Sequence, residues 1–427
     1  LAVSFMEGIE WYHIAVLYNI ALPISVYYLG KSVLSKRPTG YGQTDISEEN
    51  PELKKYKNII IKVRGSDVAI NPIFISIVIG ALLLLLGLSP LIMYYLNFTD
   101  IGFGSEDYTN VCGRQFCLMG YRTSSVTGEP IGPYGLGASI LSLSVTMALG
   151  LSLGLFYKLR SRNIIKIRQR AKKLELEFAS ALFQLGNRLG DGLPAEIAFG
   201  KVANIMQGTV SGSFFKLVSK NITRLGMSVK KAIFDPVHGA LISFPSNLIE
   251  SSMKVLVQSV KKGPVIAAQA LVNVSRYIKQ IHTVNERLKD LMADIISSMN
   301  SQIKFLAPAI SGIVIGITSM VTGILGKLGA QLQEITLGAG EQAGLDSIFG
   351  DGIPTYYFQI IVGLYIVQIT YILTILVNGI ENGSDKLSER HDLGNNLISS
   401  TLLYCIISLA VMLIFNIVAS QILSTTF

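Results

Sequence analysis

Six stretches of the chain are apolar over the length needed to cross a lipid bilayer. A membrane helix needs about 20 consecutive apolar residues, because the hydrocarbon core holds no water to satisfy the backbone. None of the six stretches has Lys, Arg, Asp or Glu in its central part. The predicted spans are Trp11–Leu29, Pro72–Leu96, Tyr134–Tyr157, Phe305–Leu325, Thr355–Val377 and Leu397–Ile422.

Between the third and fourth spans the pattern changes to that of amphipathic helices. From Ile164 to Leu189 the apolar residues recur every three or four positions, which places them on one helix face. The turn GDGLP then ends this helix, because Gly190 and Gly192 accept a positive φ and Pro194 suits the first turn of the next helix. Three more helices are predicted, one ending at Met206, one over Ser213–Lys231 and one from Pro245 to Lys261.

A fifth helix of this region is the longest and runs toward the fourth span. Its apolar residues alternate in spacings of three and four, the pattern of a helix packed along its length in a bundle or a coiled coil. The pattern fits packing within one chain or pairing of two copies. The stripe consists of Leu271, Val274, Ile278, Ile281, Leu288, Met292, Ile295, Met299 and Leu306.

These patterns predict an all-α, polytopic membrane protein of about six spans with a helical-bundle module between the third and fourth. Only 15% of the residues are charged and the mean hydropathy is +0.48, which places the chain in the membrane class. The predicted divisions are 1–29, a first span; 30–71, a basic loop; 72–157, two spans with an outside loop over 97–133; 158–304, the module; and 305–427, three spans.

The distribution of Lys and Arg predicts the orientation. Gly30–Asn71 holds eight of them and is expected in the cytoplasm, whereas Asn97–Pro133 holds two and is expected outside. Residues 158–304 hold 23 Lys and Arg against 9 Asp and Glu, a net charge of +14, while the whole chain has +8. The module is therefore expected in the cytoplasm of a multi-pass cell-membrane protein, and its partner should be acidic.

The spans carry little that transport chemistry would use. Ion-coupled transporters place ionisable residues at mid-membrane, and here only Gln359, Gln368 and Asn416 are modest polar candidates. A transporter or permease stays as the alternative function. The sequence GLSLG, with Gly150 and Gly154, has the Gly-x-x-x-Gly spacing that lets two helices approach closely.

No motif for catalysis, nucleotide binding or metal binding is found in the sequence. A phosphate-cradling Gly-x-x-x-x-Gly-Lys-Ser/Thr loop is missing, as are His-Glu-x-x-His and Gly-x-Ser-x-Gly. The four histidines and three cysteines do not have zinc-ligand spacing. We expect a protein that is not an enzyme and holds no cofactor or metal, so that any energy must come from a partner.

The predicted outside loop carries two candidate modifications. Cys112 and Cys117 are separated by four residues in a compartment where disulfides persist, so we expect them to pair. Asn97-Phe98-Thr99 is the one glycosylation sequon placed outside, which makes Asn97 the candidate acceptor.

The stretch FASALFQLGNRLGDGLPAEIAFGKVA, followed by a long helix that enters the last spans, resembles the type II secretion system F family. The arrangement of spans around the module is most similar to the archaeal assembly platforms of archaella and type IV pili. The resemblance covers the chain from about Leu174 to the last span. It implies a platform that gathers pilin-like subunits in the membrane above a cytoplasmic hexameric ATPase. The family often carries two related modules, and here Gly30–Asn71 is too short to be a second one.

The resemblance implies an ATPase partner, and basic residues of the module are the candidate contacts for it. Arg168, Arg170, Lys172 and Lys173 lie too far beyond the third span to be needed as a topology signal. Changing all four to Glu is expected to abolish assembly and leave the protein folded. The further candidates are Lys230, Lys231, Lys261 and Lys262. A homodimer and membrane lipid are the other expected partners, and nucleic acid is not. The alternative is a scaffold whose basic run Tyr157–Lys173 binds anionic lipid.

Overall fold

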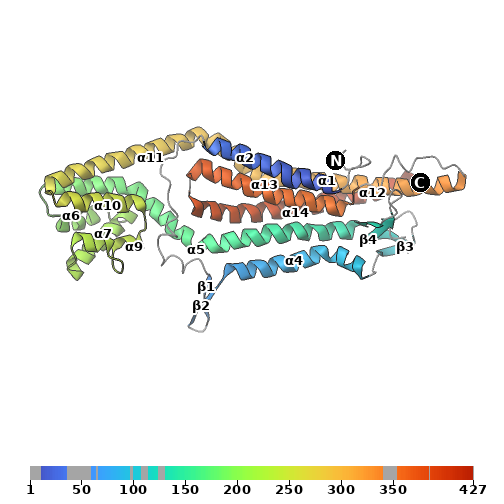
Figure 1. Ribbon diagram of the computed structural model, residues 1–427, viewed down its shortest axis with the longest axis horizontal. Helices are drawn as coiled ribbons and strands as arrows, with labels where there is room; N and C mark the ends of the chain where they lie inside the picture. The colour runs from blue at the N-terminus through green and yellow to red at the C-terminus, as the bar shows by residue number, and fades with distance from the viewer. Residues whose placement is uncertain are drawn as a thin grey trace.

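The computed structural model describes residues 11–35, 59–63, 66–96, 100–106, 114–123, 130–339, 353–383 and 385–426. Six of its helices are long and apolar enough to cross a membrane, which confirms the predicted class. They lie side by side in one bundle, and a compact helical module sits at one end of it (Figure 1). The six segments are Trp11–Ser32, Pro72–Tyr95, Leu136–Arg162, Pro264–Ile324, Thr355–Asn382 and Lys386–Val418.

Two helices run without interruption from the bundle into the module. α5 extends over 55 residues, Leu136–Gly190, and so joins the predicted third span to the first helix of the module. At about 1.5 Å per residue it is about 80 Å long. α11 (Pro264–Ser301) continues through a short π-helix, η4 (Gln302–Leu306), into α12 (Ala307–Ala339). The two connections between module and bundle are therefore helical.

The module is completed by five shorter helices between α5 and α11. The predicted helix over Ser213–Lys231 is in fact two helices, because Gly226 takes a left-handed φ of 60° and ends the first of them. The hydroxyl of Ser228 then accepts the backbone N–H of Lys231 and caps the second. The five are α6 (Ala195–Ile205), α7 (Val210–Leu225), α8 (Val229–Phe234), α9 (Ala240–Ser243) and α10 (Asn247–Val260).

The module has a hydrophobic core of its own, and the stripe predicted for its first helix lies in it. Leu174, Phe178, Leu182 and Leu185 are fully buried in this core. The ring of Phe178 contacts those of Phe214 and Phe215 at centroid distances of 6.1 and 6.2 Å. Burying a large apolar side chain contributes about 1.5–3 kcal/mol, so these residues help to hold the helices of the module together.

The membrane-length helices pack around α5, α13 (Thr355–Asn382) and α14 (Lys386–Thr426). The Gly-x-x-x-Gly motif acts within the chain: Gly150 lies against Thr401, and Gly154 lies against Ile398 on α14. α4 (Pro72–Tyr95) packs against α5 and exposes many large apolar side chains on its other face. The remaining span consists of α1 (Trp11–Val16), the π-helix η2 (Leu17–Ala21) and α2 (Leu22–Ser35).

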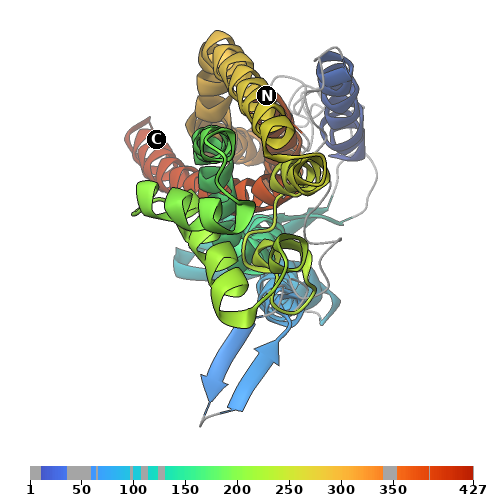
Figure 2. The ribbon, with the colours of Figure 1, turned by 90° about the vertical axis from the view of Figure 1, so that its left-hand side faces the viewer.

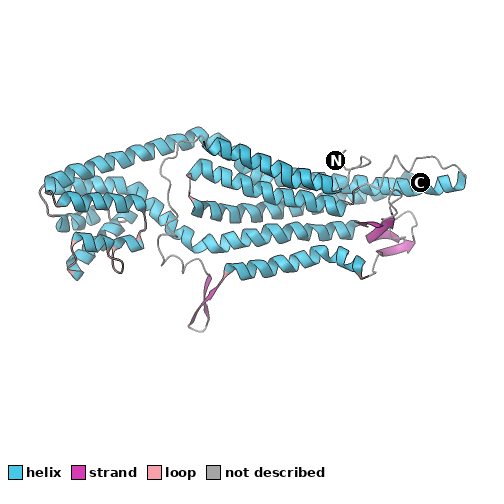
Figure 3. Ribbon diagram, in the orientation of Figure 1, coloured by secondary structure: helices cyan, strands magenta, loops and turns pink. Residues whose placement is uncertain are grey.

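In the described parts of the chain, five short strands occur where only loops were predicted (Figure 3). β1 (Ile59–Val63) and β2 (Ser66–Ile70) form an antiparallel hairpin that projects beside the module, at the bottom of Figure 2. β3 (Ile101–Glu106), β4 (Arg114–Thr123) and β5 (Pro130–Tyr134) form an antiparallel sheet at the opposite end of the bundle. The described hairpin, which belongs to the predicted basic loop, thus lies toward the module end of the bundle, as the predicted alternation of spans requires.

Candidate functional site

The eight basic residues predicted to contact a partner all lie on the module, but they are not equivalent. Seven of them are exposed to solvent. Arg168 is the exception, because only 8% of its surface is accessible. The exposed seven are Arg170, Lys172, Lys173, Lys230, Lys231, Lys261 and Lys262.

Arg168 forms two ion pairs at the junction between the module and the bundle. Its Nε donates to Asp385 Oδ2 at 3.2 Å, and its Nη1 lies 3.5 Å from Glu175 Oε1. Both carboxylates are themselves about 90% buried, since their side chains are 10% exposed. The prediction that Arg168 contacts a partner is therefore wrong for this conformation: its charge is needed to neutralise two buried acids.

Glu175 extends this cluster into the module. Its Oε1 accepts a hydrogen bond from the Ser246 hydroxyl at 2.6 Å, and Ser246 is the N-cap residue of α10. The backbone carbonyl of Glu175 lies 3.2 Å from Nε2 of His282 on α11. The cluster thus joins α5, the start of α10 and the middle of α11.

Asp385 extends the same cluster to the bundle, because it begins α14. Its Oδ1 accepts the backbone N–H groups of Leu387 and Ser388 at 3.2 and 3.3 Å, the arrangement of an N-cap. Its carbonyl accepts the Asn378 amide at 3.1 Å, which holds the end of α13. Burial opposes its ionisation, yet Arg168 and the hydrogen bonds from Ser388 outweigh this and lower the pKa of Asp385.

The lowered pKa of Asp385 predicts a contribution to stability that depends on pH. The ionised form is favoured in the folded protein, so the contribution is fully present above the unfolded pKa of about 3.9 and is lost as the pH falls through the lower folded pKa. Asp385→Asn keeps an N-cap side chain but loses this charge. In thermal unfolding of the full chain in detergent, the deficit of the variant should be largest near neutral pH and vanish in strong acid. A deficit that is the same at every pH would contradict the assignment.

Lys172 lies one helical turn from Arg168 and belongs partly to the same junction. Its Nζ donates to Asn382 Oδ1 at 3.4 Å. Burial and the neighbouring positive charges of Lys289 and Arg168 lower its pKa, although Asp385 and Glu381 act in the opposite direction. Charges of both signs thus meet where the end of α13 meets α5 and α11.

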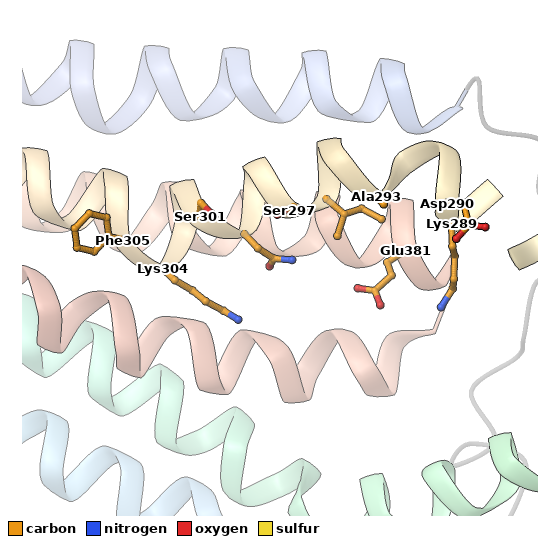
Figure 4. A pocket seen from close by; sticks show the side chains of 10 residues that line it. Lys289, Asp290, Ala293, Ser297, Ser301, Lys304, Phe305 and Glu381 are labelled. Carbon is orange, nitrogen blue, oxygen red and sulfur yellow. The ribbon is translucent and has the colours of Figure 1, made fainter. Parts of the chain in front are cut away.

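An open groove of about 670 Å³ lies between α11, η4 and the end of α13. Figure 4 shows Lys304 and Glu381 directed into the same space, with Lys289 nearer the module. The groove is lined by Lys289, Asp290, Ala293, Ile296, Ser297, Asn300, Ser301, Lys304, Phe305 and Glu381.

Two of the three polar residues weighed for transport make hydrogen bonds between neighbouring helices, whereas the side-chain oxygen of the third, Gln368, is buried without a hydrogen-bond partner among the described residues. Gln359 is fully buried, accepts from the Ser142 hydroxyl at 2.8 Å and donates to the Ser408 hydroxyl at 3.4 Å. Asn416 donates to the Ser319 hydroxyl at 3.1 Å. These bonds join α5, α13 and α14, and α12 to α14, so they serve helix packing in the bundle.

Cys117 lies in β4 and is disulfide-bonded, while Cys405 is free and buried. Cys112 and the glycosylation candidate Asn97 lie outside the described residues, so both assignments stay predictions.

If Cys112 and Cys117 are paired, the native full-length protein should incorporate alkylating reagent at neither residue until a reductant is added, as read by mass spectrometry. Alkylation of both without reductant would refute the pairing.

Comparisons of the chain with models of protein families, with curated proteins and with solved structures found no significant match. The resemblance given above thus rests on the sequence features quoted for it.

Proposed function

We propose that the chain is an assembly platform of an archaellum or an archaeal type IV pilus. In this role it docks a cytoplasmic hexameric secretion ATPase through the module and passes the movement of the ATPase to pilin-like subunits in the membrane. The observation that supports the proposal best is α5, one helix that is both a membrane-length segment and a core element of the module. A platform needs such a connection, whereas a transporter does not.

The ion-pair cluster links the module to two particular membrane helices besides α5. Arg168 on α5 holds Asp385 at the turn between α13 and α14, so a displacement of the module is passed to two further membrane helices. The second connection, α11 to α12, contains η4, whose π-helical turn is a common feature of functional sites. We propose that module movement rotates or pushes the bundle through these two links.

The docking face follows from which basic residues are exposed. With Arg168 excluded, the remaining three of the first group, Arg170, Lys172 and Lys173, are exposed on the first module helix. The pairs Lys230–Lys231 and Lys261–Lys262 lie near the ends of other helices of the module. An acidic surface of the ATPase would be steered to these charges, and the module would lie in the cytoplasm with the β1–β2 hairpin.

A homodimer paired through α11 is the second part of the proposal. The apolar stripe predicted for α11 has a buried part and an exposed part. Leu271 and Ile278 are buried in the module core, whereas Ile295 is exposed. A separate exposed set, Tyr277, Val284 and Leu291, recurs every seven residues. With the half-buried Ile281 and Leu288 between them, they give the alternating spacing of four and three of a coiled-coil seam, so a second copy of α11 is the partner that fits it.

Leu291→Lys is expected to weaken this dimer at least tenfold, because it places a charge in an apolar seam where Leu291 is 78% exposed in the monomer. The mass of the detergent-solubilised full chain, measured over a range of concentrations, reads out the change. Leu225→Lys, at an exposed leucine on α7, is the matched control and should leave the mass unchanged. A dimer that persists equally in both variants would exclude this seam.

Deletion of the gene in the source cell, with re-expression of the full chain, tests the proposed function. Electron microscopy of the cell surface should show loss of one class of filament in the deletion strain and its return on re-expression. Unchanged filaments, with altered uptake of a solute, would instead support the transporter. If filaments persist and the only change on deletion is in the lipid composition of the membrane, the scaffold alternative is favoured.

A further inference from the structure

The groove between α11, η4 and α13 lies where the surface of a bilayer would meet the bundle. Lys158 follows the predicted third span, and Gly394 packs against its backbone, so both mark the boundary of the apolar layer. Ser400 is six residues further along α14, about 9 Å deeper. Its hydroxyl donates to the Ile303 carbonyl at 2.7 Å, which places Lys304 at that depth.

The groove extends outward from this point across the head-group layer. Lys289 lies 15 residues before Lys304 on the same helical run, about 22 Å away along the axis and therefore outside the boundary. The polar layer of each leaflet is about 5–8 Å thick. The stretch near Asn300, Ser301 and Lys304 lies on the inner side of this layer: Asn300 is about 6 Å outward of Lys304, and the Lys304 side chain is directed into the same space as Glu381, so its ammonium can reach the layer from below.

The chemistry of this stretch suits a phosphate group. Lys304 carries three N–H donors, so it can bind a phosphate even though Asp392 on α14 also attracts it. Asn300 and Ser301 add an amide and a hydroxyl that can donate to phosphate oxygens. Asp290 and Glu381 lie toward the module end, where they would repel a second phosphate and accept a hydroxyl or ammonium donor.

The surface below the groove suits an acyl chain. Phe305 lines the groove and is 63% exposed, and further exposed apolar residues follow it, Leu306 at the end of η4 and then Ile310 and Ile313 on α12. Apolar side chains at this depth face hydrocarbon. A ligand with a phosphate at Lys304 and a hydrocarbon tail along α12 would match both surfaces.

We infer that this groove binds one phospholipid whose head group carries a hydrogen-bond donor, its phosphate at Lys304, Asn300 and Ser301 and its head-group donor toward Glu381. The inference is independent of the proposed platform role and of the basic run on α5. A bound lipid would fill the space between α11 and the end of α13, and so brace the helix that joins module and membrane.

Native mass spectrometry of the delipidated full chain tests this inference. Phosphatidylglycerol is titrated against phosphatidylcholine with the same acyl chains, on the wild type, Lys304→Gln, Lys304→Arg and Lys254→Gln. Lys254 is an exposed lysine on α10 that pairs with Glu250, so it is a matched control for loss of one charge. We expect one phosphatidylglycerol to be retained in preference to phosphatidylcholine, with affinity at least fivefold lower in Lys304→Gln only.

Equal retention of the two lipids, or equal affinity in the wild type and Lys304→Gln, would overturn the inference. Glycerol phosphate, added as the free head group, separates the two sources of phosphate. If it binds as tightly as phosphatidylglycerol, the site serves a soluble phosphate and the lipid assignment is wrong. If Lys304→Gln does not fold, Asn300→Ala, at a partly exposed position, replaces it and is expected to lower the affinity in the same way.

Discussion

Arg168→Glu is expected to prevent the chain from reaching a stable folded state. The substitution would put a third carboxylate between Glu175 and Asp385, both about 90% buried, and remove the cation that neutralises them. Removing one partner of a buried ion pair costs about 3–5 kcal/mol, and reversing its charge adds repulsion. Because most domains are stable by about 5–15 kcal/mol, this is a large fraction of the total. Thermal unfolding of the purified full chain and its yield in the membrane read out the loss.

Arg170→Glu is the matched control, because it makes the same charge change two residues away on the same helix. Arg170 is exposed, and surface charges contribute little to stability, so this variant should unfold within a few degrees of the wild type. Equal unfolding temperatures for Arg168→Glu and Arg170→Glu would mean that the cluster does not hold the junction together.

The spans and the module core could be predicted from the sequence because each depends on a local pattern. Twenty apolar residues define a span wherever they occur, and a three-to-four spacing such as that of Leu174, Phe178 and Leu182 identifies the buried face of its own helix. The continuity of α5 was harder to see. Lys158, Arg160 and Arg162 interrupt the apolar pattern there, although straight-chain basic residues are good helix formers.

The ion-pair cluster could not be predicted, because its members come together only in the fold. Arg168 and Asp385 are 217 residues apart in sequence, and nothing local distinguishes Arg168 from the exposed Arg170. One signal was present: Asp385 precedes a long helical pattern, as an N-cap residue would. The short strands were missed for a different reason, since β-propensity depends on the neighbouring strand and is weak in a loop sequence read alone.

With Arg168 removed from the docking face, the second large effect is expected for a triple variant of the exposed residues beside it. The variant combines Arg170→Glu, Lys172→Glu and Lys173→Glu. If the module docks the ATPase here, the change should abolish filament assembly and weaken ATPase binding. Binding of the wild type should weaken as salt is added, because charged contacts on a surface are screened, whereas the binding left in the variant should not weaken further. Arg168 is left intact, and the buried stripe from Leu174 onward is untouched, so insertion and folding should persist.

Three measurements on the triple variant separate docking from folding. Filament density on the cell surface and co-purification of the ATPase should both fall, while the unfolding temperature of the purified full chain should stay close to that of the wild type. Lys172 also bonds Asn382, so Lys172→Gln is included to show what the loss of that bond does alone. A double variant, Lys261→Glu with Lys262→Glu, makes the same type of charge change at the exposed pair that follows α10. It tests whether that pair also belongs to the docking face. Normal filament density in the triple variant would place the docking site elsewhere, and loss of the variant from the membrane would mean that these residues set topology.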